Sequence, residues 1–454
     1  MKQNRETCVL YVTATCNLQC KYCYIDKSPV LVSIDEMLEK SYQDDYYFNF
    51  MQEMFEKNKL KRMEFWGGEP TYGLVRAVPT VKKALNYFPN LHEFFLSTNL
   101  SLPSCVSDIM NFCQIAKEAP EREITIQLQL SLDGPLHIND FNRGKGVTKA
   151  FTENFSRLLF ECNKILGEIP NLHLRAGFKP TLDNYAIELL QTKKDVIEYY
   201  QFFDKYYTVA ESVMCNWLNT PKWQLFVSLP NTATPSPHTT ADGKRFANFC
   251  KLSNEINVEN VTKNYFKHYR NIMTFYNPDV GPRHCLDCGC STCGTGNIIL
   301  GLLPNNHISG CHNGFVELIS DYKLHAPEGA DFQIDKALFT YNGVSTDMIF
   351  TKEEYAQYEK QMAYYCRDSK FQVIELSAVI KQMAAAGQID KKYADSKTAV
   401  EGAHFIQDVT SSCMRDNIGT TGSKYLYQLG FIRLFLNGAK EEIENSGKYL
   451  SAAE

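Results

Sequence analysis

The stretch Cys16-Asn17-Leu18-Gln19-Cys20-Lys21-Tyr22-Cys23 places three cysteines in a CxxxCxxC pattern, directly after an apolar run at residues 9–12. A cubane iron–sulfur cluster that only carries electrons takes four thiolates. A compact loop with three thiols leaves one iron open, and an open iron can bind and activate a substrate. The alternative interpretation is a group of buried or zinc-bound thiols, because a three-cysteine pattern is not specific by itself.

The composition is that of a globular protein with a sizeable core. The chain has 454 residues, 44% of them hydrophobic and 22% charged, and this length allows two or three domains. The formal net charge of −5, with no basic block, predicts no nucleic-acid partner. We expect no membrane association and a cytoplasmic location, because the sequence has neither an apolar stretch of about 18 residues nor a signal-peptide core.

Sixteen cysteines are many for a chain in a reducing compartment, where metal ligation is a more common role for them than disulfide formation. Three lie at 16–23 and five at 285–311. Six others stand alone in apolar or helical surroundings, and we predict that they are ordinary buried thiols. These six are Cys8, Cys105, Cys113, Cys162, Cys215 and Cys250.

Residues 1–230 alternate between strand and helix patterns, which predicts βαβ units and a parallel sheet. Six such units indicate an α/β fold, a partial (β/α)6 TIM-like barrel, in which chemistry collects at the carboxyl ends of the strands. The predicted helices cover residues 34–57, 71–87, 103–117, 149–166 and 185–206. The predicted strands cover residues 9–13, 63–66, 93–97, 124–132, 172–178 and 224–229.

The rest of the chain has a different character. A polar, proline-containing stretch at residues 231–245 reads as a linker, and a bridging helix is expected at 246–275. The predicted division of the chain is 1–230 for the barrel, 231–283 for linker and bridging helix, 284–320 for a cysteine-rich auxiliary segment and 321–454 for a mostly helical tail that completes it.

The cysteine pattern, with Tyr22 before the third cysteine, resembles the cluster loop of the radical S-adenosylmethionine (radical SAM) enzymes. The resemblance implies that Cys16, Cys20 and Cys23 bind a 4Fe-4S cluster and that Tyr22 lies at the cofactor. In that family the open iron chelates the amino and carboxylate groups of SAM. The reduced cluster then cleaves SAM to a 5′-deoxyadenosyl radical.

Two further stretches at predicted strand ends carry the same resemblance. Gly67-Gly68-Glu69-Pro70 is similar to the family's GGEP segment, which hydrogen-bonds the methionine amino group of SAM, and Asn99 matches the polar end of the third strand. The glycines let the backbone approach a ligand closely, and the proline fixes the exit into a helix. Without this resemblance, the tetrapeptide indicates only a turn.

Ser131-Leu132-Asp133-Gly134-Pro135, followed by Asn142-Arg143-Gly144, resembles the subfamily of anaerobic sulfatase maturases and peptide-modifying enzymes. The resemblance implies that Ser131 and Arg143 contact the carboxylate or ribose region of SAM. Arginine suits a carboxylate because its planar fork makes two parallel bonds. The same comparison places Leu229 against the adenine, although an apolar strand residue is usually core.

The cysteine-rich segment presents four cysteines in a CxxCxCxxC pattern, then an apolar strand, a turn at 304–306 and one more cysteine. The pattern by itself suits zinc or iron. The strand and turn resemble the first half of the SPASM/twitch extension, which holds auxiliary 4Fe-4S clusters. The second half of that extension is missing, since only two cysteines follow. The predicted auxiliary ligands are Cys285, Cys288, Cys290, Cys293 and Cys311, with Cys366 and Cys413 as distal candidates, and we expect one or two auxiliary clusters.

The resemblance implies an enzyme that abstracts hydrogen from a peptide or protein for oxidation or cross-linking, with SAM as cofactor and flavodoxin or ferredoxin as electron donor. No catalytic side chain is identified. His312 stands where sulfatase maturases carry an aspartate, which speaks against formylglycine formation. The loop begins at residue 16, so we expect no leader-binding domain before the barrel. The alternatives are dehydrogenation of a small molecule and a non-catalytic iron–sulfur or zinc protein.

Overall fold

The fold is described from a computed structural model of the 454-residue chain. The structure describes residues 5–23, 30–218, 220–227 and 231–232, with side chains from residue 34 in the second range. It also describes short segments at 299–304, 308–309, 340–341, 344–345 and 349–350. Scattered residues between 245 and 268 and between 377 and 400 complete the described part.

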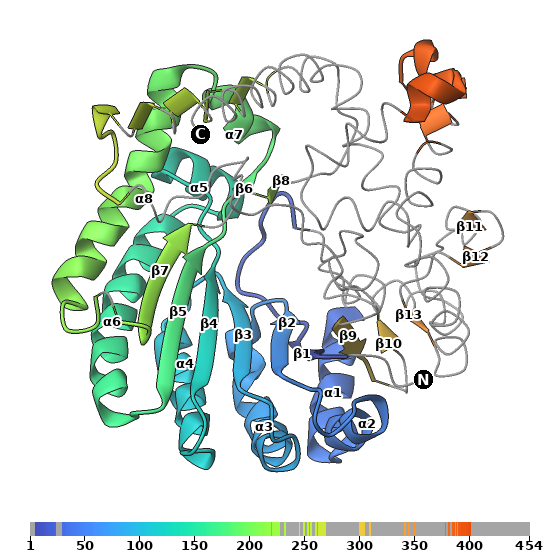
Figure 1. The fold of residues 1–454 in the computed structure, drawn as a ribbon, viewed down its shortest axis with the longest axis vertical. Helices are drawn as coiled ribbons and strands as arrows, with labels where there is room; N and C mark the ends of the chain where they lie inside the picture. The colour runs from blue at the N-terminus through green and yellow to red at the C-terminus, as the bar shows by residue number, and fades with distance from the viewer. Residues whose placement is uncertain are drawn as a thin grey trace.

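Six strands of one sheet follow the chain order in space and run parallel to one another (Figure 1). Between them run helices that cover one face of the sheet. This arrangement confirms the predicted incomplete (β/α)6 barrel, whose strands stand side by side because each crossover returns beside its predecessor. The strands are β1 (Thr7–Thr13), β2 (Arg62–Gly67), β3 (Glu93–Thr98), β4 (Ile124–Leu130), β5 (Leu172–Phe178) and β7 (Trp223–Val227).

The sheet continues beyond β1 with strands from much later in the chain. Strand β9 (Ile299–Leu302) pairs in parallel with β1, and β10 (Ile308–Ser309) returns antiparallel beside β9. This β9–β10 pair is the hairpin predicted around the turn at 304–306. Its position on the edge of the barrel sheet was not predicted. Strand β13 (Ile349–Phe350) pairs antiparallel with β10.

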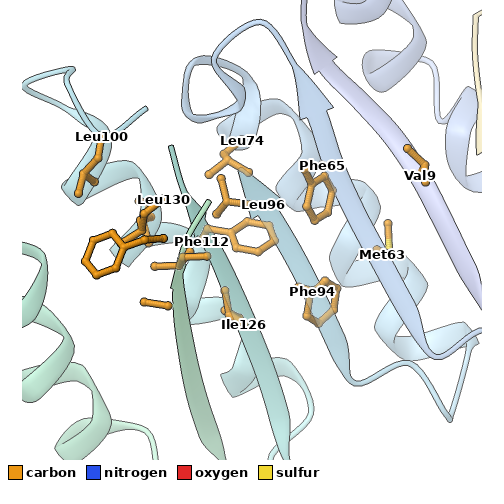
Figure 2. Packing of buried hydrophobic residues seen from close by; sticks show 14 of the residues in the cluster. Val9, Met63, Phe65, Leu74, Phe94, Leu96, Leu100, Phe112, Ile126 and Leu130 are labelled. Carbon is orange, nitrogen blue, oxygen red and sulfur yellow. The ribbon is translucent and has the colours of Figure 1, made fainter. Parts of the chain in front are cut away.

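The core lies between the sheet and its helices because alternate strand residues are apolar and point to that side. Phe65 on β2 and Phe94 on β3 pack against Phe112 on α4, with ring centroids 5.2 and 6.0 Å apart (Figure 2). The helices that follow the strands are α1 (Val30–Gln43), α2 (Tyr46–Met54), α3 (Leu74–Tyr87), α4 (Cys105–Cys113), α6 (Val147–Glu168) and α8 (Lys193–Val213).

Two helix predictions are wrong in detail, and one helix was not predicted. The helix expected over 34–57 is two helices, because Asp45 adopts a left-handed conformation (φ 56°) between α1 and α2. The helix expected over 185–206 is α7 (Asn184–Leu189) and α8, since Thr192 starts α8 with a capping box. The stretch before Gly144, which carries no predicted element, is helix α5 (Leu136–Arg143).

Smaller elements complete the described part of the chain. A two-residue parallel pair joins the exit of β5 to the exit of β7. Among the described residues, no helix is long and apolar enough to cross a membrane. The remaining elements are η1 (Pro70–Gly73), η2 (Gln114–Glu118), β6 (Thr181–Leu182), β8 (Asn231–Thr232), β11 (Thr340–Tyr341), β12 (Val344–Ser345) and η5 (Lys391–Ala394).

Four of the six lone cysteines are fully buried thiols, as predicted: Cys8, Cys105, Cys113 and Cys162. Burial raises the pKa of the Cys113 thiol to about 12, which keeps it protonated and inert. The prediction is wrong for Cys215, which is exposed just beyond the end of α8. Cys250 lies outside the described residues.

Candidate active site

The residues that follow β1 form a short loop, residues 14–23, which we call the cysteine loop. Its three cysteines are partly buried, and none is in a disulfide. The Cys23 N–H donates to the Cys20 carbonyl (3.0 Å), which closes a turn at the second and third cysteines. The Lys21 N–H donates to the Asn142 carbonyl (2.9 Å) in α5. The loop is therefore fastened to the element that follows β4.

The Cys16 sulfur accepts hydrogen bonds from two sides. The Leu18 N–H donates to Cys16 Sγ (3.4 Å), and the Asn99 side-chain amide donates to it at 3.9 Å. Such donors stabilise a thiolate, the form in which cysteine binds metal. No three acidic, histidine or cysteine side chains of the described residues converge tightly enough for a single metal ion. The three partly buried thiols lie on one short loop, and a cubane cluster would bind each thiolate to a different iron.

The two glycines after β2 are required because their backbone lies against the cysteine loop. A Cβ on Gly67 would stand 2.0 Å from the Thr13 carbonyl oxygen, and one on Gly68 would stand 2.4 Å from the Thr15 oxygen. Gly67 also has φ +144°, which side chains rarely adopt. The Gly68 N–H donates to the Thr13 carbonyl (3.0 Å) and the Glu69 N–H to the Thr15 carbonyl (2.8 Å). The GGEP segment therefore holds the start of the cysteine loop.

The Glu69 side chain is buried and binds two neighbouring segments. One carboxylate oxygen accepts from the Thr71 hydroxyl (2.8 Å) and backbone N–H (3.3 Å), and the other accepts from the Asn99 N–H (2.7 Å). Burial raises the pKa of this carboxyl above its ordinary value, and the hydrogen bonds of Asn99, Thr98 and Thr71 only partly offset the effect. Glu69 thus joins the ends of β2 and β3.

Asn99, at the end of β3, extends this network to the cysteine loop. Its amide donates to Asn17 Oδ1 (2.9 Å), and its own oxygen accepts from the Ser101 hydroxyl (2.6 Å) and N–H (2.9 Å). Asn17 donates in turn to the Ser101 hydroxyl (2.8 Å). The predicted site residue Asn99 therefore contacts the loop directly, through both Asn17 and Cys16.

A buried ion pair lies at the end of β4. Arg143 donates Nε–H (2.9 Å) and Nη2–H (2.8 Å) to the two carboxylate oxygens of Asp133, which is fully buried. The Tyr22 hydroxyl donates to the same carboxylate, and the Thr181 N–H donates to it at 3.0 Å. Burial raises the pKa of the Tyr22 phenol, so it stays a donor. For Arg143, burial lowers the pKa, but the charge of Asp133 more than offsets this and raises it.

The structure brings the predicted residues of four strand ends to one edge of the sheet. Ser131 is half-buried there, its N–H donates to the Thr98 carbonyl (2.8 Å), and its hydroxyl makes no hydrogen bond with the residues that the structure describes. Asp133 takes up two of the five N–H donors of Arg143, so the predicted contact of Arg143 with SAM stays a prediction. The residues gathered at this edge are Cys16, Cys20, Cys23, Tyr22, Gly67, Gly68, Glu69, Asn99, Ser131 and Arg143.

The remaining predicted site residues lie outside the described part of the chain. Leu229 follows β7 by two residues and is among them. Their predicted roles stay predictions, as does the number of auxiliary clusters. The cysteines concerned are Cys285, Cys288, Cys290, Cys293, Cys311, Cys366 and Cys413.

Sequence reasoning missed two acids that hold the site together. Asp133 lies in the Ser131–Pro135 stretch, but its side chain is assigned no role from the sequence, although an acid between a buried strand and a glycine is the available signal. Asp35 on α1 accepts from the Thr13 hydroxyl (2.7 Å) and the Ala14 N–H (3.0 Å), and it pairs with Arg76 (3.3 Å). The sequence does not mark Asp35 as a site residue, because acidic residues are common near the start of a helix.

A scan against protein-family models finds no match to this chain, and a search of curated proteins finds none either. Among solved structures, the chain is similar to one titled "Native anSMEcpe with bound AdoMet". That likeness has a TM-score of 0.46 and 12% sequence identity, and it covers 97% of this chain and 99% of that chain. At this degree of similarity the match carries no argument, so the site is interpreted from its own residues.

Proposed function

We propose that the chain is a radical SAM enzyme whose active site lies at the carboxyl ends of β1–β4. The observation that carries the proposal is the convergence of three segments far apart in the sequence. The cysteine loop is hydrogen-bonded to the GGEP segment after β2, to Asn99 after β3 and to Asp133 after β4. A three-thiol loop at the active edge of an incomplete barrel suits a cluster with one open iron.

The residues of the site have distinct roles in this proposal. Cys16, Cys20 and Cys23 hold a 4Fe-4S cluster, which when bound supplies the electron that cleaves SAM to a 5′-deoxyadenosyl radical. The unpartnered Ser131 hydroxyl and the spare donors of Arg143 are available to the carboxylate or ribose of SAM. Glu69 is engaged by Thr71 and Asn99, so it positions the GGEP backbone, whose carbonyls are suited to an ammonium group.

The substrate class comes from the sequence pattern of the cysteine-rich segment. We propose that a peptide or protein is modified by hydrogen abstraction, that one or two auxiliary clusters take part, and that flavodoxin or ferredoxin supplies the electron. Support comes from the CxxCxCxxC pattern and from the β9–β10 hairpin between Cys293 and Cys311. A small-molecule dehydrogenase uses the same barrel chemistry and is the second candidate. A zinc-binding protein without catalysis is the third.

The test is anaerobic incubation of the reconstituted protein with SAM and a reductant, with 5′-deoxyadenosine measured by mass spectrometry. We expect the iron–sulfur clusters to absorb at about 400 nm, and we expect 5′-deoxyadenosine to form. The triple variant with Cys16, Cys20 and Cys23 replaced by alanine should lose that product. Cys215→Ala is the matched control, because this exposed cysteine lies outside the site. A colourless zinc protein, or a triple variant that still cleaves SAM, refutes the proposal.

A further inference from the structure

The face of the sheet opposite the helices carries polar side chains, in contrast to the apolar helix-covered face. Residues paired across parallel strands lie on the same face. Glu64 on β2 is in register with Phe95 on β3, Gln127 on β4 and Arg175 on β5, and Arg175 is in register with Gln224 on β7. These residues alternate with buried apolar ones, so they line the inner face of the incomplete barrel.

On the β2–β3 half of this inner face, the described arginine is paired with two carboxylates. Arg62 forms ion pairs with Glu64 (2.8 Å) and Glu93 (3.3 Å), and its guanidinium lies 5.0 Å from the centroid of the Phe95 ring. The second oxygen of Glu64 accepts from the Trp66 indole N–H (3.0 Å). Among the described residues, this half therefore offers no unpaired cation to an anionic ligand.

The β4–β7 half is different because it holds an arginine that has no counterion among the residues that the structure describes. Arg175 is half-buried, and its Nε is fully shielded from solvent and has no hydrogen-bond partner. Among the described residues, no acid occupies an inner position of these strands, and Glu123, just before β4, is paired with His173. The inner positions of β4, β5 and β7 are Thr125, Gln127, Gln129, His173, Arg175, Gly177, Gln224 and Phe226. A half-buried guanidinium without a partner is costly, and an anionic ligand relieves that cost.

The surroundings of Arg175 are built for a planar polar group. Gln127 and Gln224 flank it on the neighbouring strands, and the Gln127 oxygen accepts from Arg62 (3.4 Å), which leaves its N–H donors available. Gln129 stands one layer closer to the strand ends, and its amide makes no hydrogen bond with the described residues. Above Arg175, Gly177 leaves room for the Phe226 ring, whose atoms would lie 2.4 Å from a Cβ at that position. Amide donors around a guanidinium, with an aromatic wall, suit a carboxylate.

Arg175 is also separate from the strand-end site. It lies four residues before Lys179, which follows the end of β5, and this spacing is about 13 Å along a strand. Ser131 and the cysteine loop lie at the level of those strand ends. A ligand that reaches Arg175 therefore extends from the cofactor edge down into the barrel.

We propose that Arg175, with the amides of Gln127, Gln129 and Gln224, binds a carboxylate of the substrate inside the barrel. This inference rests on the proposed function, because it assigns the barrel interior to the molecule that the radical attacks. The substrate is then one with an anionic arm, such as an acidic side chain or a chain end. The methionine carboxylate of SAM is the other source of the same chemistry, and the experiment separates the two.

Equilibrium dialysis of the full-length, anaerobically prepared protein with labelled glutarate tests the site, with glutaramide as the uncharged competitor at equal ionic strength. We expect glutarate to bind at least about tenfold more tightly than glutaramide, and Arg175→Gln to abolish this preference. Arg175→Lys keeps the positive charge but lacks the forked guanidinium, so this variant should retain part of the preference for glutarate. The charge control is Lys194→Gln on the exposed face of α8, which should bind glutarate like the unmodified protein.

Two results overturn the proposal. One is equal glutarate binding by the unmodified protein and Arg175→Gln, provided that circular dichroism shows both folded. The other is a loss of SAM affinity of about tenfold or more in Arg175→Gln together with no glutarate binding by the unmodified protein, which assigns the arginine to SAM. Glutarate binding requires neither cluster nor SAM, whereas the 5′-deoxyadenosine assay requires no glutarate. The inference and the proposed function therefore fail in different measurements.

Discussion

Asp133 is the residue at which the cysteine loop, α5 and the exit of β5 meet. Its carboxylate accepts from Arg143, Tyr22 and the Thr181 N–H, and its carbonyl accepts from the Tyr199 hydroxyl (3.0 Å). Every one of these donors comes from a different element. A buried carboxylate with this many partners is stable only as a complete set, because removing one member leaves another charge unpaired.

Replacing Asp133 by asparagine is therefore expected to destabilise the protein by about 3–5 kcal/mol, because the buried Arg143 guanidinium loses its counterion. Urea unfolding measures the change. Asp45→Asn is the matched control, since Asp45 pairs with Lys83 where both side chains are nearly half exposed, and such pairs contribute only about 0–1 kcal/mol. Asparagine also tolerates the left-handed backbone at position 45. Equal losses in the two variants would contradict the central role of Asp133.

Glu69 predicts a pH dependence of stability. Its pKa in the folded protein lies above the ordinary value of 4.5, because burial outweighs the hydrogen bonds from Asn99, Thr98 and Thr71. At pH values between the ordinary pKa of the unfolded chain and the raised pKa of the folded protein, the folded protein holds more protons than the unfolded chain. Its contribution to stability is therefore complete below the ordinary value and is lost as the pH rises through the raised one.

Glu69→Gln should accordingly flatten the fall in unfolding free energy with rising pH above 4.5. Urea unfolding at a series of pH values measures it. Glu121→Gln is a control whose effect on the pH dependence of stability has the opposite sign. Glu121 is exposed, and its pKa is lowered by hydrogen bonds, first of all the bond from its own backbone N–H. An identical slope in the unmodified protein and Glu69→Gln would mean that the buried carboxyl does not titrate in this range.

At the scale of elements, the site depends on how closely the turn after β2 approaches the turn after β1. The Cβ positions of Gly67, Gly68 and Gly73 all fall within 2.4 Å of a carbonyl oxygen of residues 12–15. Glycine is needed in these places because the backbones pack directly against each other. The network from Glu69 to Asn99 then carries the same alignment to the end of β3.

Gly68→Ala is expected to push the cysteine loop away from β2, because a methyl group at that position would lie 2.4 Å from the Thr15 carbonyl oxygen. We expect a loss of about 1–3 kcal/mol in unfolding free energy and a lower iron content per chain after reconstitution. Gly167→Ala in α6 is the matched control, because a Cβ there meets nothing within 4 Å. That change should be neutral or stabilising by up to about 1 kcal/mol. Full iron content in Gly68→Ala would argue against a rigid contact.

At the scale of the whole molecule, a segment from residue 299 onward completes the sheet at its β1 edge. Thr7 pairs with Ile299 and Leu10 with Leu302, and the Tyr46 hydroxyl of α2 donates to the Leu303 carbonyl (2.9 Å). The strand that ends in the cysteine loop is thus paired on both sides, between β2 and β9. The β9–β10 hairpin, which lies between Cys293 and Cys311 in the sequence, is therefore joined to the barrel through backbone pairing.

The metal content of the whole chain is the last prediction. One 4Fe-4S cluster uses four thiols, and the segment 285–311 has five, so we expect two auxiliary clusters with Cys366 and Cys413 as the distal candidates. The reconstituted protein should then hold about twelve irons per chain. Iron and zinc analysis measures it. An iron content of about eight per chain, unchanged in Cys366→Ala and Cys413→Ala, would mean that the chain has one auxiliary cluster. Substantial zinc would mean that a zinc site takes the place of the second cluster.

The sequence alone predicted the parallel barrel and the edge where its chemistry collects. Hydrophobic alternation is local, so β1 to β5 and β7 were predicted, and a parallel sheet must bring their carboxyl ends to one side. The three cysteines of the loop, the GGEP segment, Asn99, Ser131 and Arg143 were instead assigned through their resemblance to a known family, and each lies at or after the end of a predicted strand.

Only the tertiary structure decided which of these side chains hold one another. The pairing of Arg143 with Asp133, the double role of Glu69 and the unpartnered Arg175 depend on distances between residues 10 to more than 100 positions apart. The sequence also did not predict the helix break at Asp45 or the pairing of β9 with β1. Helix and strand patterns specify the local conformation of a segment, and they do not specify which segment packs beside it. Ion pairing, close backbone approach and sheet-edge pairing are contacts across space, and only the folded chain determines them.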